Sequence, residues 1–483
     1  MSRTIHIDEP KLLHIGAIAD KASVRAFVVG GYVRDLLLGI PVKDIDVVVL
    51  GSGVDFARKV ADSWNQANLV VYERFGTAML QTESCMIEFV GARKESYTKD
   101  SRKPAVEEGS LQDDLARRDF TVNAIAVSLN DDSRGLMEDP FRGEDDLAKR
   151  ILRTPLDPEA TFDDDPLRIL RAVRFASQLG FEIDPAAINA GSRMKDRLKI
   201  VSQERISDEL LKILSSPRPS VGLQLASDME ILGVIFPEVE AMAGVDQRQD
   251  FHHKDVFKHT LRVVDNLSAD TRDVWLRLAA LLHDIAKPRT KSFKEGVGWT
   301  FHGHEEVGAR MIKPIFRRMR LPLDRVAYVE KLVRLHLRPM ALVDEEVTDS
   351  AVRRLMFDAG QEVDDLMTLC RADITSKNPR LVEQVKKNYE LVALKMKEVE
   401  EKDKIRNWQP PLRGDEIMEL CGLAPGKLVG KLKDRITDAI LDGIIPNDHD
   451  AAREYLLRIK DEVIATQDDT ANSSPLRSFP PTS

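Results

Sequence analysis

The sequence predicts a multidomain protein, with an α/β head that contains a mixed sheet and a long all-α body behind it. Two observations support this prediction. The chain has 483 residues, too many for one hydrophobic core, so roughly three or four domains are expected. Short β-rich runs accompany a helical pattern from residue 22 to about 155, whereas strand signals nearly vanish after about residue 156.

The head contains several short β-rich runs and one helical segment. Residues 54–64 carry apolar side chains at helical spacing. The β-rich runs are AFVVGG at 26–31, DIDVVVL at 44–50, NLVVYERFGTAML at 68–80, MIEFVGA at 86–92 and TVNAIAVSL at 121–129. Together these runs predict the mixed sheet.

The body contains a series of segments with helical spacing, separated by caps or breakers. They cover residues 163–181, 206–216, 256–267, 273–288, 325–337, 350–360 and 388–405. Residues 408–414 are typical of a linker, and the polar, proline-containing residues 466–483 predict a disordered tail. We therefore expect domains at 22–155, 156–245, 246–395 and 396–465, followed by that tail.

Composition and cysteine spacing exclude several classes of protein. Apolar residues make up 43% of the chain and charged residues 31%, and every apolar run is far shorter than the roughly 20 residues that span a membrane. The N-terminus lacks the layout of a signal peptide. Cys85, Cys370 and Cys421 form no CxxC pair, which argues against a disulfide framework or a thiolate zinc site. These features predict a cytoplasmic protein without membrane contact.

The charge distribution leaves one question open. The formal net charge of −9 argues weakly against nucleic acid as a partner, because phosphate binding relies on Lys and Arg. Residues 310–338, however, contain nine Lys or Arg against two acidic residues. This stretch is either a solvated helix face or a surface for a polyanion.

One motif in the head has the residue types of a phosphate and metal site. Gly30 and Gly31 follow a predicted strand and precede a helix, so backbone N–H groups there can approach a phosphate. Arg34 lies one helical turn later and can bind the same anion. Asp44 and Asp46 are two apart on a strand and point to the same face. Such a pair either requires a cation, with Mg²⁺ favoured by oxygen ligands near phosphate, or consists of exposed turn residues.

Three further motifs follow in the chain. EDPFRGEDDLAKRILRT predicts a turn that leads into a strand. In DDDPLRILRAVRF, i, i+3 and i+4 spacing places carboxylates and guanidinium groups on one helix face. The polar side chains of interest are Arg118, Asp119 and Asn123 in RRDFTVNAIAVSL, and Asp164, Asp165, Arg168 and Arg171 in DDDPLRILRAVRF.

In this order along the chain, GGxVRDxLLG…DxD, RRDFTxNA, DPFxG…DL and DDPLRxLRAxRF resemble the motifs of class II CCA-adding tRNA nucleotidyltransferases. Their bacterial poly(A) polymerase relatives share these motifs, and both belong to the polymerase-β-type superfamily. The resemblance covers about residues 22–235, and QERISDELLKIL at 203–214 fits the family's next helical motif. It implies a polymerase-β-type nucleotidyltransferase head, with the tRNA 3′ end as partner and CTP and ATP as substrates.

The resemblance also implies a catalytic centre. Asp44 and Asp46 would hold Mg²⁺ ions, one activating the attacking 3′-hydroxyl and one stabilising the pyrophosphate leaving group. The residues implied to bind the incoming nucleotide are Gly30, Gly31, Arg34 and Arg118, with Asp119 and Asn123 near its sugar and phosphates.

Base recognition is implied for the helix with Asp165 and Arg168, with Arg171 beside them. An Asp acceptor and an Arg donor can together satisfy a Watson–Crick edge. The sequence departs from the family pattern at Asp164, where many relatives carry Glu. Another departure is Arg142, which replaces a frequent Gly in a flexible loop.

The helical body holds a second set of chemistry-bearing residues. In chain order they are His259, the adjacent pair His283 and Asp284, His302, His304, His336 and Asp373. A single histidine on a helix is usually a packed or exposed residue, but a His-Asp pair with an earlier His and a later Asp is harder to dismiss. Neutral imidazoles with carboxylates suit Mn²⁺, Ni²⁺, Fe or Zn²⁺ without selecting one.

This second set resembles the HD phosphohydrolase superfamily over about residues 246–395. The implied metal ligands are His259, His283, Asp284, His304, His336 and Asp373. His304 is preferred over His302. In bacterial proteins with such a head, the HD domain is associated with hydrolysis of phosphoesters, including 2′,3′-cyclic phosphates at damaged RNA ends. The alternative is a degenerate HD domain that serves as a tRNA-binding scaffold.

The shared motifs cannot separate CCA addition from poly(A) addition. Phe75, Gly76 and Thr77 resemble the CCA-type pattern, and residues 412–443 resemble the end of HD-containing CCA enzymes, which implies RNA binding by 396–465. These features favour full CCA addition. The alternatives are a poly(A) polymerase or an enzyme that adds only CC or only A. Other classes are an HD phosphohydrolase with a non-catalytic RNA-binding head and a non-catalytic tRNA-binding protein.

Overall fold

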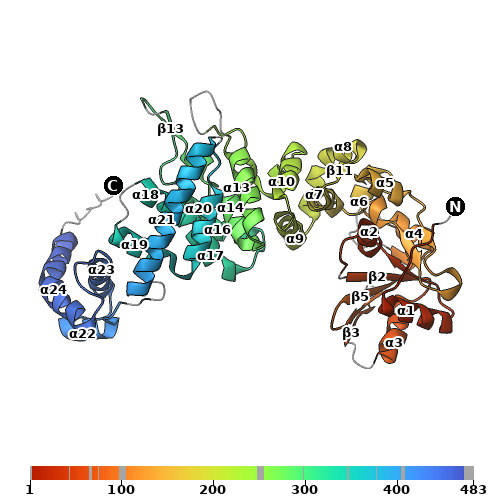
Figure 1. The fold of residues 1–483 in the computed structure, drawn as a ribbon, viewed down its shortest axis with the longest axis horizontal. Helices are drawn as coiled ribbons and strands as arrows, with labels where there is room; N and C mark the ends of the chain where they lie inside the picture. Colours follow the sequence, from red (N-terminus) through yellow and green to blue (C-terminus); the bar gives the residue numbers. More distant parts are fainter. Residues whose placement is uncertain are drawn as a thin grey trace, which may run out of the picture. The chain divides into compact units, whose positions relative to one another are not determined.

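The computed structural model describes residues 3–42, 44–64, 68–73, 76–96, 105–246, 255–296, 298–344, 348–376, 378–403, 408 and 410–472. The chain forms two compact units (Figure 1). The N-terminal unit comprises residues 1–243 with 318–321, and the C-terminal unit comprises residues 244–317 with 322–483. Phe75, part of the CCA-type pattern, lies outside the described residues.

A seven-stranded sheet forms the core of the head, in the order β3-β4-β5-β2-β1-β8-β9. Its strands are β1 (Ala26–Val29), β2 (Asp44–Val49), β3 (Asn68–Tyr72), β4 (Thr77–Gln81), β5 (Met86–Gly91), β8 (Ala126–Ser128) and β9 (Met137–Glu138). β2 and β5 pair in parallel, whereas the other neighbours pair antiparallel. The predicted mixed sheet is confirmed. The valines of β1 and β2 are almost fully buried in its middle, which explains their apolar runs.

Helices and a separate hairpin complete the head around the sheet. The helices are α1 (Pro10–Lys21), α2 (Gly31–Leu38), α3 (Gly53–Ser63), α4 (Leu111–Ala116) and α5 (Gly143–Lys149), and β6 (Arg93–Ser96) and β7 (Ala105–Glu108) form the hairpin. α1 and α3 lie together on one side of the sheet (Figure 1). Phe56 of α3 packs there against Phe89 of β5, with ring centroids 5.9 Å apart. This contact anchors β5, the neighbour of β2.

A helical neck follows the head. It consists of α6 (Pro158–Asp164), α7 (Leu167–Leu179), α8 (Pro185–Arg193), α9 (Gln203–Leu214), α10 (Pro219–Asp228), α11 (Leu232–Ile235) and α12 (Pro237–Glu240), with a short parallel pair of β10 (Ile151–Leu152) and β11 (Glu182–Ile183). α7 packs against both α9 and α10. Its Ile169, Leu170 and Val173 are fully buried, so α7 is held firmly at the edge of the head.

The segment around Arg142 was predicted as a turn that leads into a strand. The turn and the strand β10 (Ile151–Leu152) are present, but the prediction missed a helix between them. Residues 143–149 form α5. The Asp139 carboxylate accepts hydrogen bonds from the backbone N–H groups of Gly143 and Glu144 at 2.7 and 2.9 Å. These bonds satisfy amide groups that the first turn of a helix leaves free, which stabilises the helix start.

The expectation that Asp165 and Arg168 share one helix face was wrong. Asp165 has extended backbone angles (φ −141°, ψ 101°), and α7 begins only at Leu167. Pro166 explains the difference, because a residue before proline avoids the helical region. Asp165 therefore lies in the break between α6 and α7.

The described part of the C-terminal unit is helical apart from one hairpin. Its elements are α13 (Val256–Asp270), α14 (Val274–Leu282), α15 (Lys287–Thr290), β12 (Ser292–Lys294), β13 (Gly298–Thr300), α16 (His304–Arg318), α17 (Val326–Leu335), α18 (Arg338–Asp344), α19 (Asp349–Ala359), α20 (Val363–Ala372), α21 (Pro379–Asp403), α22 (Gly414–Cys421), α23 (Lys427–Leu441) and α24 (His449–Asn472). The helical body is confirmed, whereas the hairpin of β12 and β13 was not predicted. All three cysteines are free.

The last three helices have a core of their own. Leu412 and apolar residues of α22, α23 and α24 form this cluster, with Leu432, Ile436 and Leu456 among its most buried members. Arg354 of α19 joins α23 to the preceding helices through hydrogen bonds to Asp438 and Asp442. α24 continues to Asn472, into the segment expected as a disordered tail, and residues 473–483 lie outside the described part.

The basic stretch at 310–338 carries many ion pairs. Lys331 pairs with Glu362 at 2.7 Å, and Arg334 pairs with Glu306 at 3.3 Å and with Glu330 at 2.7 Å. Arg338 and Arg318 are also paired with carboxylates. These contacts favour an ion-paired helix surface over a surface for a polyanion.

No described helix combines the length and the apolar character that a membrane span requires.

Gly53→Ala tests how tightly α3 is packed on the sheet, and Gly430→Ala in α23 is its control. At Gly53 a Cβ would lie 2.5 Å from the backbone N of Gly91 and 2.6 Å from the backbone carbon of Val90. Because backbone atoms cannot move aside cheaply, Gly53→Ala should lower the free energy of unfolding by about 1–3 kcal/mol. At Gly430 in α23, no described atom would contact a Cβ within 4 Å, so Gly430→Ala should be neutral or slightly stabilising. Differential scanning calorimetry measures both, and equal melting temperatures would contradict the prediction.

Candidate functional site

Asp44 and Asp46 lie at the start of β2, on the same face of the strand. Asp44 is exposed and Asp46 is partly buried. In the sheet, Asp46 pairs in register with Val29 of β1 and with Glu88 of β5. Burial raises the pKa of the Asp46 carboxyl; Arg118 opposes this shift, and Asp44 adds to it. The two aspartates therefore interact electrostatically, as a shared cation site requires.

Glu88 is a third carboxylate that the sequence analysis missed. Its pKa is raised by burial and by the negative charge of Asp46. Its only signal in the sequence is an acidic residue inside the apolar run MIEFVGA. Its place beside Asp46 depends on the parallel register of β2 and β5, which no local pattern reveals.

Arg118 supplies positive charge next to these carboxylates. At Gly30, where φ is +72°, a Cβ would lie 2.7 Å from Arg118 Nη1 and 3.1 Å from Asp46 Oδ2. Only glycine permits both this backbone angle and this close approach. Arg118 also pairs with Asp114, at 3.2 Å between Nη2 and Oδ2. Asp114 is fully buried and was likewise missed from the sequence.

A chain of hydrogen bonds connects α2 to α7. Arg34, one turn after Gly31 at the start of α2, donates from Nη1 to Asn123 Oδ1 at 2.8 Å. Asn123 Nδ2 donates to Asp119 at 2.9 Å, and Arg171 Nε donates to Asp119 at 2.8 Å. Burial acts to raise the pKa of Asp119, but Arg171 and Asn123 hold it below its usual value. The structure thus brings these four predicted side chains into one network.

Asp165 and Arg168 are fixed from different sides. Asp165 accepts a hydrogen bond from Arg205 Nη2 at 2.7 Å. Arg168 donates to the backbone oxygens of Thr161 and Arg117, at 3.0 and 2.5 Å. Arg205 of α9 was not singled out from the sequence, because only the tertiary contact places it beside Asp165.

Two cavities of about 220 Å³ each adjoin these groups. The first is lined by Asp46, Glu88 and Arg93 among others. The second is lined by Arg117, Arg118, Asp119, Asp165, Arg168, Arg171 and Arg205. Arg117 and Arg118 line both, so the carboxylates of β2 and β5 adjoin the arginine-rich cavity. This arrangement provides a place for an anionic ligand beside a group of carboxylates.

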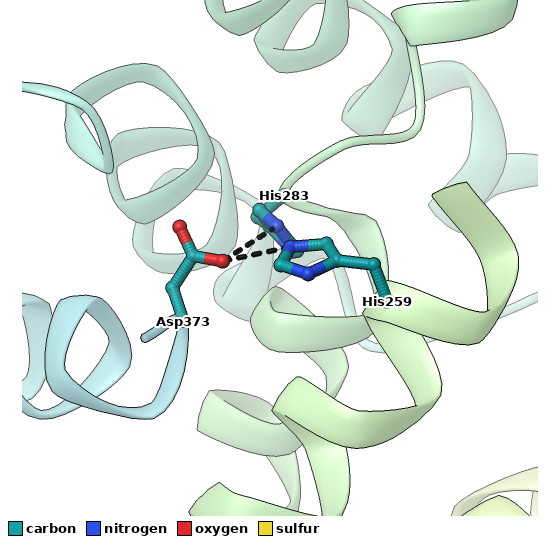
Figure 2. Close-up of side chains that lie close together, drawn as sticks. All are labelled: His259, His283 and Asp373. Carbon is teal, nitrogen blue, oxygen red and sulfur yellow. Dashed lines mark ion pairs between the residues drawn. The ribbon is translucent and has the colours of Figure 1, made fainter. Parts of the chain in front are cut away.

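The C-terminal unit brings the second predicted set together. The residues come from α13 (His259), the end of α14 (His283 and Asp284), the start of α16 (His304), the end of α17 (His336) and the end of α20 (Asp373). Figure 2 shows His259 and His283 facing Asp373, with Nε2 to Oδ1 distances of 2.8 and 3.7 Å. These three residues form one potential metal group.

Asp284, His304 and His336 form a second potential metal group. Asp284 Oδ1 lies 3.3 Å from His304 Nε2 and 3.8 Å from His336 Nε2. Its other oxygen, Oδ2, lies 3.1 Å from His283 Nε2 in the first group. Asp284 therefore stands between the two groups and can serve both.

Backbone carbonyls orient three of the four imidazoles. The Nδ1 atoms of His283, His304 and His336 donate to carbonyl oxygens three residues earlier, at 2.7, 2.8 and 2.7 Å. His283 and His336 directly follow α14 and α17, where a helix leaves its last carbonyls without intrahelical partners. Because a carbonyl only accepts, Nδ1 carries the proton, and in the neutral ring the Nε2 lone pair faces the cluster.

The charges of the cluster fit a divalent cation. His304 and His336 place their Nε2 atoms 3.3 Å apart, and the buried Nε2 of His283 has no hydrogen-bond partner. Burial lowers the pKa of His336 to about 4. Burial also acts to lower the pKa of His283, but Asp284 and Asp373 outweigh it and raise it to about 9. The site thus demands positive charge, which a metal bound to neutral imidazoles and carboxylates supplies.

Of the two histidines in TFHGHEE, His304 is buried in the cluster and His302 is exposed. Lys287 was not singled out from the sequence. Its Nζ donates to Asp284 Oδ2 at 2.7 Å, so it contributes a further positive charge at the edge of the cluster.

Known families match three parts of the chain. A Poly A polymerase head domain matches residues 26–153, a probable RNA and SrmB-binding site of polymerase A matches residues 180–242, and an HD domain matches residues 256–377. The CC-adding tRNA nucleotidyltransferase of Thermus thermophilus is 33% identical over 452 residues, which cover 89% of this chain and 93% of that protein. The chain belongs to the tRNA nucleotidyltransferase family.

Other members of the family differ in the reaction that their names state. The A-adding tRNA nucleotidyltransferase of Deinococcus radiodurans is 35% identical, covering 67% of this chain and 73% of that protein. The Multifunctional CCA protein of Tolumonas auensis is 31% identical, covering 72% and 84%. A solved structure of a CCA-adding enzyme in its apo form shares the fold, with a TM-score of 0.61, 24% identity and coverage of 94% and 93%.

The metal content of two histidine variants tests whether His304, and not its exposed neighbour His302, is a metal ligand. His304→Ala removes a ligand from the group with Asp284 and His336, so bound divalent metal should fall by about one ion per chain in a protein purified with metal. His302→Ala, two residues away and exposed, should keep the content of the unaltered protein. Elemental analysis after dialysis measures both. A loss in His302→Ala, or none in His304→Ala, would contradict the proposed ligand set.

Proposed function

We propose that the chain adds C, C and A to the 3′ end of tRNA, from CTP and ATP and without a template. The observation that supports this most directly is the arginine-lined cavity beside the carboxylates of β2 and β5. We assign the addition to the domains expected at 22–155 and 156–245, and a contribution to RNA binding to the domain expected at 396–465. The relative named Multifunctional CCA protein supports the same reaction.

The proposed reaction is an in-line displacement at phosphorus. The 3′-oxygen of the RNA attacks the α-phosphorus of the nucleotide, the bond from that phosphorus to the bridging oxygen breaks, and pyrophosphate leaves. Mg²⁺ held by Asp44 and Asp46, with Glu88 beside them, would neutralise charge that develops on the attacking and leaving oxygens. Arg117 and Arg118, which line both cavities, would bind the phosphates.

Base selection is assigned to Asp165 and Arg168, with Arg171 beside them. Asp165 is an acceptor held by Arg205, and Arg168 is a donor held by two backbone oxygens. A guanidinium has five N–H groups, so these two bonds leave donors for a base edge. Arg171 is already bonded to Asp119, which fits a role in positioning.

A second candidate is partial addition. Relatives named for A addition and for CC addition are as similar to this chain as the multifunctional one. The deciding experiment incubates the purified chain with Mg²⁺, labelled CTP and ATP, and tRNAs that lack one, two or three terminal nucleotides. Completion of CCA on all three supports the proposal. Addition that stops after CC, or that occurs only after CC, establishes the partial reaction, and a long A tail overturns both.

Asp46→Ala should reduce nucleotide addition at least about 100-fold, because it removes a ligand and charge stabilisation from the phosphoryl-transfer site. Asp44→Ala should have the same effect. Asp55→Ala is the matched control, since Asp55 is an exposed aspartate in α3 of the same head. Addition rates under single-turnover conditions measure the effect. Near-normal addition by Asp46→Ala would refute the assignment.

Arg168→Ala and Asp165→Ala should change nucleotide choice more than metal use. Each polar pair with a base is worth about 1–3 kcal/mol, so discrimination against UTP and GTP should weaken roughly 5- to 100-fold. The measurement is relative incorporation of the four nucleotides at several Mg²⁺ concentrations. Unchanged selectivity with good activity would remove these residues from base recognition.

We further propose that the HD domain at 246–395 hydrolyses phosphoesters, including 2′,3′-cyclic phosphates. In that reaction a water oxygen bonds to phosphorus and one P–O bond to the ribose breaks, leaving a phosphomonoester and a free hydroxyl. The support is the set of four imidazoles and two carboxylates whose metal-binding atoms converge. Its donors suit Mn²⁺, Ni²⁺, Fe or Zn²⁺, and the bound ion would activate the water.

His283→Ala and Asp284→Ala should abolish hydrolysis of 2′,3′-cyclic nucleotides while nucleotide addition survives. The reason is that the proposed addition residues belong to the other compact unit, and sites that share no residues usually act independently. Assays with Mn²⁺ and Ni²⁺ measure hydrolysis. If the unaltered protein hydrolyses nothing with any divalent metal and binds none, the domain is a scaffold.

A further inference from the structure

The β12–β13 hairpin lies between two residues of the metal cluster in the chain. The backbone leaves the cluster at Asp284, passes through α15 and the hairpin, and returns to it at His304. Trp299 is five residues from His304, so its Cα lies at most about 18 Å away. Phe301, just after β13, accepts the hydrogen bond from His304 Nδ1 at 2.8 Å. The hairpin is therefore tied directly to a proposed metal ligand.

Two large aromatic side chains are exposed on this hairpin. Phe293 and Trp299 are cross-strand partners, with ring centroids 5.2 Å apart and an interplanar angle of 74°. Their relative exposures are 52% and 38%. Exposed rings of this size forgo the free energy of burial, so an aromatic pair held at a hairpin surface is a typical feature of a binding site.

Three cations lie on the segment that carries the aromatic pair. Lys291 Nζ lies 4.4 Å from the centroid of the Trp299 ring. Arg289 and Lys294 are exposed on the same short segment. Among the described residues, none of the ion pairs involves Arg289, Lys291 or Lys294. In contrast to the paired cations of 310–338, these three are available to an anion.

Unpaired cations next to exposed aromatic faces are the combination that binds single-stranded nucleic acid, because bases stack on the rings while cations meet the phosphates. We propose that the β12–β13 hairpin is a stacking platform for the unpaired 3′-terminal nucleotides of RNA, and that it presents their terminal phosphate to the HD cluster. This inference rests on the proposed hydrolysis for its purpose, but the binding that it asserts can be tested without hydrolysis.

The first experiment measures binding to the full-length chain. A single-stranded RNA should quench tryptophan emission in the unaltered protein, and Trp299→Phe should remove that quenching while fluorescence anisotropy shows nearly the same affinity. Trp299→Ala should weaken binding of the same RNA about 5- to 100-fold, the range for loss of one stacked base. Leu391→Ala is the control, because Leu391 is 62% exposed on α21 of the same unit.

The second experiment measures hydrolysis of RNA that ends in a 2′,3′-cyclic phosphate, with either adenine or no base on the terminal nucleotide. The unaltered protein should have a kcat/KM about 5- to 100-fold higher for the adenine terminus than for the terminus without a base, the range for one stacked base. Trp299→Ala should lose this preference. Phe293→Ala should lower kcat/KM for the RNA more than for free 2′,3′-cyclic AMP. Leu391→Ala should leave every value unchanged.

The outcomes distinguish this inference from the proposed hydrolysis. Specific quenching and weaker binding by Trp299→Ala support the platform even if no phosphoester is hydrolysed. Hydrolysis without any effect of Trp299→Ala on binding or base preference overturns the platform alone. If Phe293→Ala lowers kcat/KM equally for RNA and for free 2′,3′-cyclic AMP, the hairpin binds free nucleotides, and its proposed role in RNA binding is overturned. Loss of bound metal in Trp299→Ala, by elemental analysis, would make the hairpin a structural support and also overturn it.

Discussion

Negative charge that the fold concentrates at buried positions must be compensated, and both sites depend on this constraint. In the head, β2 and β5 place Asp46 beside Glu88, and α4 buries Asp114 completely. A buried carboxylate without a partner costs several kcal/mol, so such a group persists only with opposite charge at contact distance. Arg118 pairs with Asp114 at 3.2 Å and opposes the charge of Asp46, and it lies against the backbone of Gly30, where a side chain would not fit. The glycine, the arginine and the carboxylates therefore depend on one another, although they come from segments far apart in the sequence.

The HD cluster meets the same constraint with imidazoles. His283 and His336 sit at helix C-termini, where free backbone carbonyls accept hydrogen bonds from Nδ1 and turn Nε2 toward the carboxylates. The packing of α14 therefore does two things at once: its apolar residues bury the helix, and its C-terminus aims His283 and Asp284 into the cluster. Since backbone carbonyls hold these two imidazoles, their orientation depends on where α14 and α17 end.

Local patterns predicted the parts of both sites that one segment determines. The period of a strand predicted the shared face of Asp44 and Asp46. The second set comes from five helices, and it was predicted only through its resemblance to the HD superfamily. Contacts between distant segments that no motif marks were not predictable: Glu88 joins the first site through the register of β5, and Arg205 reaches Asp165 from α9. Asp165 itself was misplaced because helical spacing was counted across Pro166. The β12–β13 hairpin was missed because its strands are only three residues each, too short for an alternating pattern to stand out.

The donor atoms of the two sites argue for different metals. The cavity beside Asp46 offers carboxylate oxygens as metal ligands, and its described lining residues include neither His nor Cys. Oxygen ligands beside a phosphate-binding surface favour Mg²⁺, which binds weakly to protein and arrives with the nucleotide. The HD cluster offers four imidazoles and two carboxylates, and nitrogen donors favour transition metals over Mg²⁺. With the proposed metals bound, abundant Mg²⁺ should not displace the transition metal from the HD cluster, so the two proposed ions would need no separation by compartment.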